Sequence, residues 1–502
     1  MVEDGVRGLA PTVDGMIRRD PEQAQSRSHD LIVIGAGIYG VAMTLEAARR
    51  GLRVVLLERD DFGGATTWSS LRILHGGLRY LQTFDLPRFF DSVAERRWFC
   101  RHFPDLVQPL PCLMPLYGRG LKRPGILRIA LAMNDALGFR RNAGVVAACH
   151  LPGGRLLSAS EVRDRYPEVP REGLKGGALW YDVVMPNPQR ILIEMLHWAC
   201  AAGAIALNYV SATALRVRDG HVQGVEAYDR GADRTLTLDA PVVFNCAGPW
   251  SRTLGAQFDR DVAALFEPSL AFNLLLDHPP LSDAALAIEP PGGRTYFMHP
   301  HQGRIMVGTS HWPWFGAVDR PYPTEEQLEH FLSELNRAAP VLRCTRDMVL
   351  RVFAGLLPSR RAGTAKVAVR EVLYDHGRHG GPHGLFSLSG VKYTTARRVV
   401  ADALAVAWRG RGGLPHQRRV ARPEASREIT FGEQDWPIDP TAPRATVRLQ
   451  HLVEQEAVLQ VDDLLLRRAD WTTEPGRGDL ISAQIGRLLN GDSQARASAA
   501  SR

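Results

Sequence analysis

The sequence predicts an α/β protein that begins with a Rossmann-like nucleotide-binding region and continues into antiparallel sheet, with a helical segment near the C-terminus. Three observations lead to this fold class. A strand–turn–helix–strand unit occupies residues 31–58. Alternating runs such as Arg304 to Gly308 occur within residues 266–350 and favour antiparallel strands. Helical periodicity returns at residues 446–470 and 478–490.

The composition indicates a large globular protein. Its 502 residues correspond to about two to four domains. With 45% hydrophobic and 23% charged residues, the chain does not belong to the disordered, collagen-like or mucin-like classes. A membrane-spanning helix needs roughly 18 consecutive apolar residues, and no run in the sequence approaches this length. No membrane-spanning helix is therefore expected.

Charge and cysteine content narrow the range of partners. The net charge of +7 is spread along the chain, which favours an anionic small molecule or a membrane surface as partner. Only four of the 61 basic residues are lysines, and an arginine excess of this kind is a poor indicator of nucleic-acid binding, so no nucleic-acid partner is expected. The six cysteines form no C-x-x-C pair, which predicts a reduced, cytoplasmic protein without a structural metal.

The first structural unit carries a dinucleotide-binding motif. Leu31–Ile34 is typical of a buried parallel strand, and Gly35-Ala36-Gly37-Ile38-Tyr39-Gly40 follows it at the start of a helix. Its glycines allow a tight turn, close approach to a pyrophosphate and helix–strand packing. The pyrophosphate is expected at the helix N-terminus, where amide groups and the helix dipole favour an anion. Glu58 ends the next strand, where it can bind an adenosine ribose and disfavours a 2′-phosphate.

Two segments after this unit favour FAD over NAD. Ala65-Thr66-Thr67-Trp68-Ser69-Ser70 offers hydroxyl pairs suited to a phosphate-binding loop. The segment Arg72 to Leu81 contains His75-Gly76-Gly77-Leu78-Arg79-Tyr80, whose paired glycines allow backbone to approach a flat ring. A polar surface loop is the alternative, but it does not explain why histidine, glycine, arginine and tyrosine are concentrated there.

These segments resemble the FAD-dependent, quinone-linked glycerol-3-phosphate dehydrogenases, which have the D-amino-acid-oxidase-like flavoprotein fold. Members of that family typically read A-T-S-S-x-S-S-K-L-I-H-G-G-L-R-Y-L where this chain has residues 65–81. The resemblance continues at residues 245–250 (N-C-A-G-P-W), 308–310 (G-T-S), 389–395 (S-G-V-K-Y-T-T) and 462–468 (D-D-L-L-L-R-R). It therefore extends over most of the chain, from about residue 29 to 470.

The resemblance implies an α/β fold in which a Rossmann-like FAD-binding domain is interleaved with an antiparallel-sheet substrate domain, followed by a small helical C-terminal domain. Flexible tails are expected at 1–28 and 491–502, the FAD-dependent oxidoreductase region at 29–412, and the helical domain at 413–490. Within the oxidoreductase region, segments 29–110, 191–265 and 351–412 are expected to bind FAD. Segments 111–190 and 266–350 are expected to form the substrate domain.

The resemblance also implies a reaction, the oxidation of sn-glycerol-3-phosphate to dihydroxyacetone phosphate. Arg79, Tyr80 and Lys392 correspond to the substrate-facing catalytic residues. Arg79 can pair with a phosphate or an oxyanion, and Lys392 can stabilise negative charge near the pyrimidine edge of the flavin. The residues expected to hold FAD without a covalent link are Gly35, Gly37, Ile38, Gly40, Glu58, Thr66, Thr67, Ser69, Ser70, Gly76, Gly77, Leu78, Gly248, Trp250, Gly355, Gly390, Lys392 and Thr394.

Three positions depart from the family pattern and concern the substrate site. Leu357 stands where the family's G-V-R-P-L has a substrate-contacting arginine, Arg72 replaces a lysine, and His311 replaces an aspartate. Arg360 and Arg361 follow closely and could restore the charge, so His311 and Arg360 are candidate substrate-binding residues. Two alternatives remain: a flavoenzyme of the same fold with a different hydroxy or amino substrate, and a flavin-bound protein without catalysis.

The expected electron acceptor is a quinone or another carrier. Residues 119–141 place Ile126, Ile129, Ala130, Met133 and Leu137 at helical spacing among basic residues. Such a helix could lie on an anionic membrane, while packing on its own sheet is the alternative. The expected location is therefore the cytoplasm, with peripheral contact to the inner face of the membrane as a further hypothesis.

Overall fold

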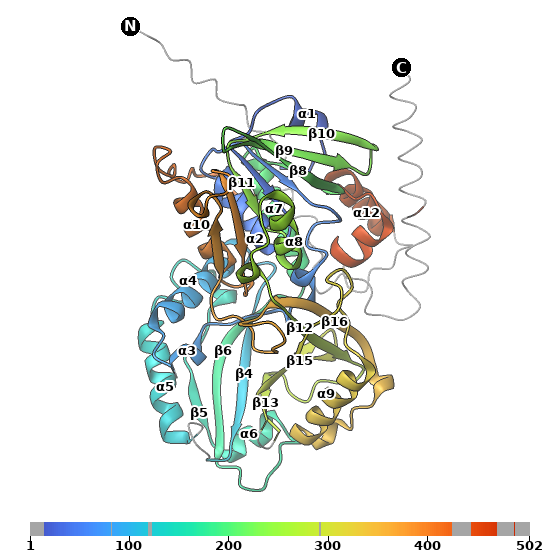
Figure 1. Ribbon diagram of the computed structural model, residues 1–502. Helices are drawn as coiled ribbons and strands as arrows, with labels where there is room; N and C mark the ends of the chain where they lie inside the picture. The colour runs from blue at the N-terminus through green and yellow to red at the C-terminus, as the bar shows by residue number, and fades with distance from the viewer. Residues whose placement is uncertain are drawn as a thin grey trace.

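The computed structural model describes residues 15–81, 83–118, 123–290, 293–423, 443–468 and 486. Within these residues the strands form sheets of six, nine and three strands. Figure 1 shows the six- and three-stranded sheets in the upper half of the molecule and the nine-stranded sheet in the lower half. The predicted α/β fold is confirmed. No helix in the described part of the chain is long and apolar enough to cross a bilayer.

The helices lie around these sheets. They are α1 (Pro21–Gln25), α2 (Ile38–Ala48), α3 (Leu78–Leu81), α4 (Leu86–His102), α5 (Pro124–Leu137), α6 (Ala159–Arg165), α7 (Pro188–Ala201), α8 (Ser251–Phe258), α9 (Glu325–Ala338), α10 (Ala396–Ala407) and α12 (Pro443–Gln455). Two short turns also matter for the site, the 3-10 turn η1 (Thr66–Ser69) and the π-helical turn η10 (Asp463–Arg468).

The six-stranded sheet is the Rossmann-like part of the molecule. Its order is β17 (Val372–Asp375), β18 (Leu385–Ser389), β11 (Val243–Asn245), β1 (Leu31–Ile34), β2 (Val54–Leu57) and β7 (Ile205–Leu207). Its pairs are parallel except β17 with β18.

Both faces of this sheet are buried. Leu31 and Val33 of β1 pack into the core formed with α2, α7 and α10, whereas Ile32 and Ile34 pack on the opposite face. That second face is covered by the antiparallel sheet of β8 (Val210–Arg218), β9 (His221–Asp229) and β10 (Arg234–Asp239). Burial on both sides explains why β1 reads as an unbroken apolar run instead of an alternating one.

The nine-stranded sheet is mixed, because β4 and β13 pair in parallel while its other pairs are antiparallel. Its order is β16 (Val349–Pro358), β12 (Pro268–Leu276), β15 (Arg304–Pro313), β14 (Tyr296–His301), β13 (Ala285–Ile288), β4 (Gln108–Leu116), β6 (Gly176–Val184) and β3 (Ile73–Leu74), with β5 (Arg155–Leu157) also on β6. Strands β3 and β16 come from segments assigned above to FAD binding. The two larger sheets are therefore interleaved along the chain.

The two tails and the C-terminal helical segment are only partly described. Residues 1–14 and 491–502 lie outside the described residues, as does most of 469–490 and all of 424–442. Residues 15–28 differ from the expected flexible tail, since Pro21–Gln25 form helix α1 and Ile17 is 1% exposed. The reason is a long-range contact: the Ile17 amide donates a hydrogen bond to the Gln455 carbonyl.

Helix α5 lies within residues 119–141, the segment that the sequence predicts to be helical. Leu127 and Leu131, one turn apart, pack against the nine-stranded sheet. Ile126 and Ile129 face away and are 41% and 63% exposed. The helix therefore packs on its own sheet and also leaves an apolar outer face.

Candidate functional site

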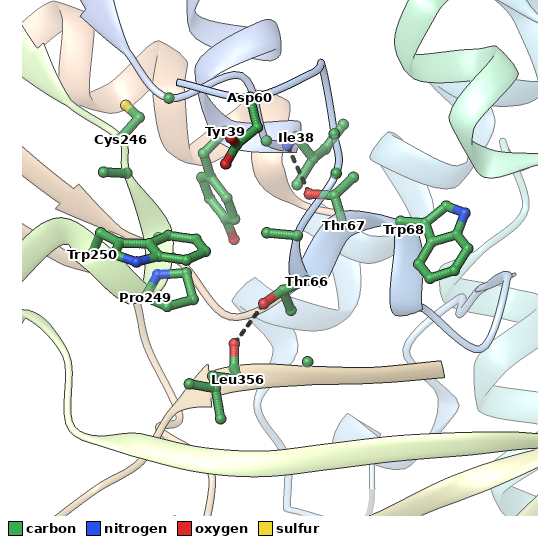
Figure 2. A pocket seen from close by; sticks show the side chains of 18 of the residues that line it. Ile38, Tyr39, Asp60, Thr66, Thr67, Trp68, Cys246, Pro249, Trp250 and Leu356 are labelled. Carbon is green, nitrogen blue, oxygen red and sulfur yellow. Dashed lines mark hydrogen bonds between the residues drawn. The ribbon is translucent and has the colours of Figure 1, made fainter. Parts of the chain in front are cut away.

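A cavity of about 800 Å³ lies between the two larger sheets, at the carboxyl ends of β1, β2 and β11. Ligands of open α/β sheets bind at this edge, where the strand order reverses. Loops after all three strands line the cavity, together with β16 and residues 390–393. Figure 2 shows Ile38 and Thr67 on one side of it and Trp250 with Pro249 on another.

The glycine-rich turn leaves room for a phosphate group. Gly35 has φ +97°, and a Cβ there would lie 2.7 Å from the Cys246 carbonyl oxygen. At Gly40 a Cβ would lie 1.8 Å from the Gly35 carbonyl oxygen, so this glycine serves close packing of α2. Gly37 caps α2 without a side chain, and Gly37 and Ile38 line the cavity. The positive end of the helix dipole therefore faces the cavity, as an anion-binding site requires.

Glu58 supports this turn and keeps capacity for a ligand. Its Oε2 accepts a hydrogen bond from the Ala36 amide at 2.7 Å, and its Oε1 accepts one from the Asp60 amide at 2.9 Å. Burial raises the pKa of Glu58, against the opposing effect of these two hydrogen bonds. Because each carboxylate oxygen can accept two hydrogen bonds, the ribose hydroxyls of a dinucleotide can still be bound.

The hydroxyl-rich loop is fixed to the opposite wall. Thr66 Oγ1 donates to the Leu356 carbonyl at 2.9 Å, as Figure 2 shows, and Ser69 Oγ donates to the Ala354 carbonyl at 2.6 Å. Thr67 Oγ1 accepts from the Ile38 amide at 3.0 Å. The sequence predicts that these hydroxyls help to hold FAD; in the structure they also join the loop to β16 and α2, and each hydroxyl keeps capacity for a further hydrogen bond. They shape the cavity wall.

Most of the predicted cofactor residues line this cavity. They are Gly35, Gly37, Ile38, Glu58, Thr66, Thr67, Ser69, Ser70, Gly248, Trp250, Gly355, Gly390 and Lys392. Gly40, Gly76, Gly77, Leu78 and Thr394 are not among the lining residues. Gly76 is explained by packing, because a Cβ there would lie 2.0 Å from Arg96 Nη1.

A buried carboxylate that sequence reasoning missed organises the segment around Gly76. Asp182 accepts hydrogen bonds from the Gly76 amide at 2.7 Å and from Arg96 Nη1 at 2.8 Å, and it pairs with His75 Nδ1 at 3.1 Å. Burial alone would raise the pKa of Asp182, but His75 and Arg96 lower it to about 2. A histidine held through Nδ1 by a carboxylate leaves Nε2 for proton transfer. Asp182 carried no sequence signal, because its partners are far away in the chain.

Three residues predicted as substrate-facing lie together. The Lys392 ammonium is 4.3 Å from the centre of the Tyr80 ring, on the ring face. Burial and the nearby charge of Arg79 lower the pKa of Lys392 to about 8. Lys392 also lines the cavity, whereas Arg79 and Tyr80, both on the short helix α3, are not among the lining residues, and Arg79 is exposed. The cluster therefore places two cations and an aromatic ring at one edge of the cavity.

Tyr39, in a variable position of the glycine motif, is a further residue that sequence reasoning missed. Its hydroxyl donates to the Lys392 carbonyl at 2.9 Å and accepts from the Lys392 amide at 3.1 Å. A Cβ at Gly390 would lie 1.8 Å from Tyr39 Cζ, so the glycine makes room for this ring. Tyr39 thereby fixes the backbone that carries the Lys392 side chain.

Of the residues discussed above for the substrate site, only some line the cavity. Leu357 lines the cavity. Arg360 and Arg361 are exposed and are not among the lining residues, and neither is His311. Burial and the charge of Arg294 lower the pKa of His311 to about 4. None of these three residues therefore forms part of the cavity wall near Leu357.

The fold and the site define a class of protein, a dinucleotide-binding flavoprotein. The glycine turn at the α2 N-terminus, the carboxylate of Glu58 and the volume of the cavity all fit FAD, since cofactor cavities span roughly 300–1,000 Å³. A family model described as DAO, FAD dependent oxidoreductase, matches residues 30–393. The chain belongs to this family and is an FAD-dependent oxidoreductase.

Several relatives share most of the chain. A glycerol-3-phosphate dehydrogenase of Synechocystis is 31% identical over 76% of this chain and 70% of its own length. Glycerol-3-phosphate dehydrogenase 1 of Mycobacterium tuberculosis is 34% identical over 88% of this chain and 90% of its own. The structure of glycerol-3-phosphate dehydrogenase from Bacillus halodurans complexed with FAD has a TM-score of 0.67 at 21% identity, covering 94% of this chain and 95% of its own. This last similarity shows the shared fold.

Proposed function

We propose that the protein oxidises sn-glycerol-3-phosphate to dihydroxyacetone phosphate and passes the electrons to a quinone. The observation that carries this proposal is the cluster of Arg79, Tyr80 and Lys392 at the cavity edge, joined from segments more than three hundred residues apart. Two cations at one place suit a dianionic phosphate ester. The names of the Synechocystis and Mycobacterium tuberculosis relatives support the same substrate.

The residues of the cluster have separate tasks in this proposal. FAD, when bound, supplies the acceptor for the hydride that leaves C2 of the substrate. Arg79 binds the substrate phosphate, and Lys392 stabilises negative charge that develops beside it. His75, held through Nδ1 by Asp182, takes the hydroxyl proton at Nε2. The Tyr80 ring holds the ammonium of Lys392 in position through a cation–π contact.

A second candidate function is favoured by Leu357. This side chain gives the cavity an apolar surface where a substrate-contacting arginine is expected, and Arg360 and Arg361 are exposed outside the lining. Such a cavity suits a flavoenzyme of the same fold whose substrate is a larger or less charged hydroxy or amino compound.

The two candidates are separated by flavin reduction in the absence of oxygen. The holoenzyme is mixed with glycerol-3-phosphate, free glycerol, hydroxy acids and amino acids, and bleaching of the flavin absorbance is followed. Glycerol-3-phosphate should reduce the flavin much faster than glycerol does. Equal rates with these two compounds, together with faster reduction by another compound, would establish the second candidate.

The outer face of α5 supports the membrane part of the proposal. Ile126, Ile129 and Phe139 are 41%, 63% and 76% exposed, and exposed Arg123 and Arg128 lie in the same segment. Apolar side chains flanked by arginines suit an anionic bilayer surface, where a quinone is available. We place the protein in the cytoplasm, at the inner face of the membrane. Sedimentation with anionic but not with neutral vesicles is the expected result.

A further inference from the structure

We propose that residues 456–468 form part of the FAD site, closing its adenosine end and controlling how fast FAD is released. The cofactor contacts expected from the sequence end at Thr394, so this segment adds a separate wall. The proposal rests on FAD binding alone and is independent of the substrate.

The segment reaches the cavity beside the predicted ribose position. Gln460, Asp462 and Arg467 line the cavity together with Glu58 and Tyr209. In a Rossmann-like site the carboxylate at the end of the second strand marks the adenosine ribose, which here is Glu58. The adenosine end is therefore bordered by polar groups from the C-terminal part of the chain.

A buried ion cluster anchors the segment to the loop that follows Glu58. Asp61 has a fully buried side chain that accepts hydrogen bonds from Arg467 Nε at 2.6 Å and from Arg468 Nη1 at 2.8 Å. Burial alone would raise the pKa of Asp61, but the charges of Arg468 and Arg467 lower it. Removing one partner of such a buried cluster leaves an uncompensated charge, which disfavours the docked position.

Two further contacts tie the segment to other walls of the cavity. Trp68 Nε1, in the hydroxyl-rich loop, donates to the Leu466 carbonyl at 3.1 Å. The Tyr209 hydroxyl donates to Asp463 Oδ1 at 2.6 Å. The turn η10 thus bridges the loop after β2, the loop of η1 and the strand β8 region, all of which border the cavity. Release of the adenosine end past these walls requires the segment to undock.

Linkage makes this arrangement reciprocal. If docking of residues 456–468 slows FAD release, bound FAD must stabilise the docked segment by the same free energy. Amide hydrogen exchange in residues 456–468 should therefore be slower in the holoprotein than in the apoprotein. Helix α9, which packs on the nine-stranded sheet away from the cavity, should show no comparable change.

The test uses the full-length holoprotein with Arg467→Gln, Arg467→Lys and Trp68→Phe. FAD release is followed by the rise of free flavin fluorescence after dilution, well below the unfolding temperature. Arg467→Gln and Trp68→Phe should release FAD at least tenfold faster, and Arg467→Lys should lie between them and the unchanged protein. Arg397→Gln is the matched control, because Arg397 is also mostly buried and also bonds two buried carboxylates, those of Glu95 and Glu46, but does not line the cavity.

A purely structural role for the segment has a different signature. It would lower the unfolding temperature of the apoprotein and the holoprotein equally and leave the FAD release rate unchanged. Release rates within twofold of the unchanged protein in Arg467→Gln and in Trp68→Phe would overturn the proposal. Hydrogen exchange on the unsubstituted protein covers the case in which a variant does not fold, since equal exchange of residues 456–468 with and without FAD would also overturn it.

Discussion

The charge state of Lys392 predicts that the rate of flavin reduction falls as the pH rises through about 8. Burial and the charge of Arg79 lower the pKa of Lys392 to about 8. A group with this pKa is about 90% charged at pH 7 and about 10% charged at pH 9. If the charged ammonium is needed for substrate binding and turnover, the second-order rate constant for flavin reduction should fall about tenfold between these pH values.

Lys392→Met identifies the group responsible. The methionine keeps a long unbranched side chain but removes the ammonium that lies over the Tyr80 ring, so reduction at pH 7 should be at least about tenfold slower, which corresponds to about 1.4 kcal/mol. This variant should show no further decline between pH 7 and 9. The substrate phosphate does not titrate in this interval, because its second pKa is near 6.

The assay is stopped-flow flavin bleaching without oxygen, at low substrate concentration, because the second-order constant then reports on the free enzyme. Lys175→Met is the matched control, since Lys175 is an exposed lysine that does not line the cavity. The reasoning would be refuted by a constant rate from pH 7 to 9 in the unsubstituted protein. It would also be refuted if Lys392→Met kept the same decline.

Three further predictions concern the cofactor, the substrate and the membrane. Gly37→Asp should yield colourless protein that does not regain flavin on adding FAD, because it places a carboxylate where the pyrophosphate approaches; a normal flavin spectrum would contradict this. Leu357→Arg should strengthen binding of glycerol-3-phosphate by roughly 10–150-fold, since a charge-assisted hydrogen bond contributes about 1.5–3 kcal/mol. Arg360→Ala should leave the preference for glycerol-3-phosphate over glycerol unchanged. Titration of flavin bleaching with each compound measures both effects. Ile129→Asp should reduce sedimentation with anionic vesicles several-fold without changing flavin reduction, and unaltered sedimentation would remove α5 from the membrane contact.

The local parts of the fold were predictable, and the long-range contacts were not. The strand of residues 31–34, its glycine turn and Glu58 lie within thirty residues of one another, and each follows from a local backbone requirement. The proximity of Tyr80 to Lys392 came from a family resemblance, because nothing in their spacing indicates contact. The hydrogen bond of Thr66 to β16 could not be anticipated, since its acceptor is a backbone carbonyl, which every residue carries.

Asp182 illustrates the same limit. An aspartate in a strand reads as an ordinary polar residue until its partners His75, Gly76 and Arg96 are brought to it by the pairing of β3 and β4 with β6. The mixed character of the nine-stranded sheet was also missed, because parallel pairing of β4 with β13 joins segments that look like antiparallel strands individually.

The strand order of the six-stranded sheet has a consequence for biosynthesis. Strands β1 and β2 emerge from the ribosome first, but β18, at residues 385–389, pairs with β11 next to them and is synthesised about 330 residues later. At about 5–20 residues per second this delay lasts tens of seconds. During that time β1 gains its second neighbour, β11, at residues 243–245, but the cavity still lacks residues 390–393 and Arg467. Because these residues complete the cavity wall, we expect FAD to bind tightly only when synthesis of the chain is nearly finished.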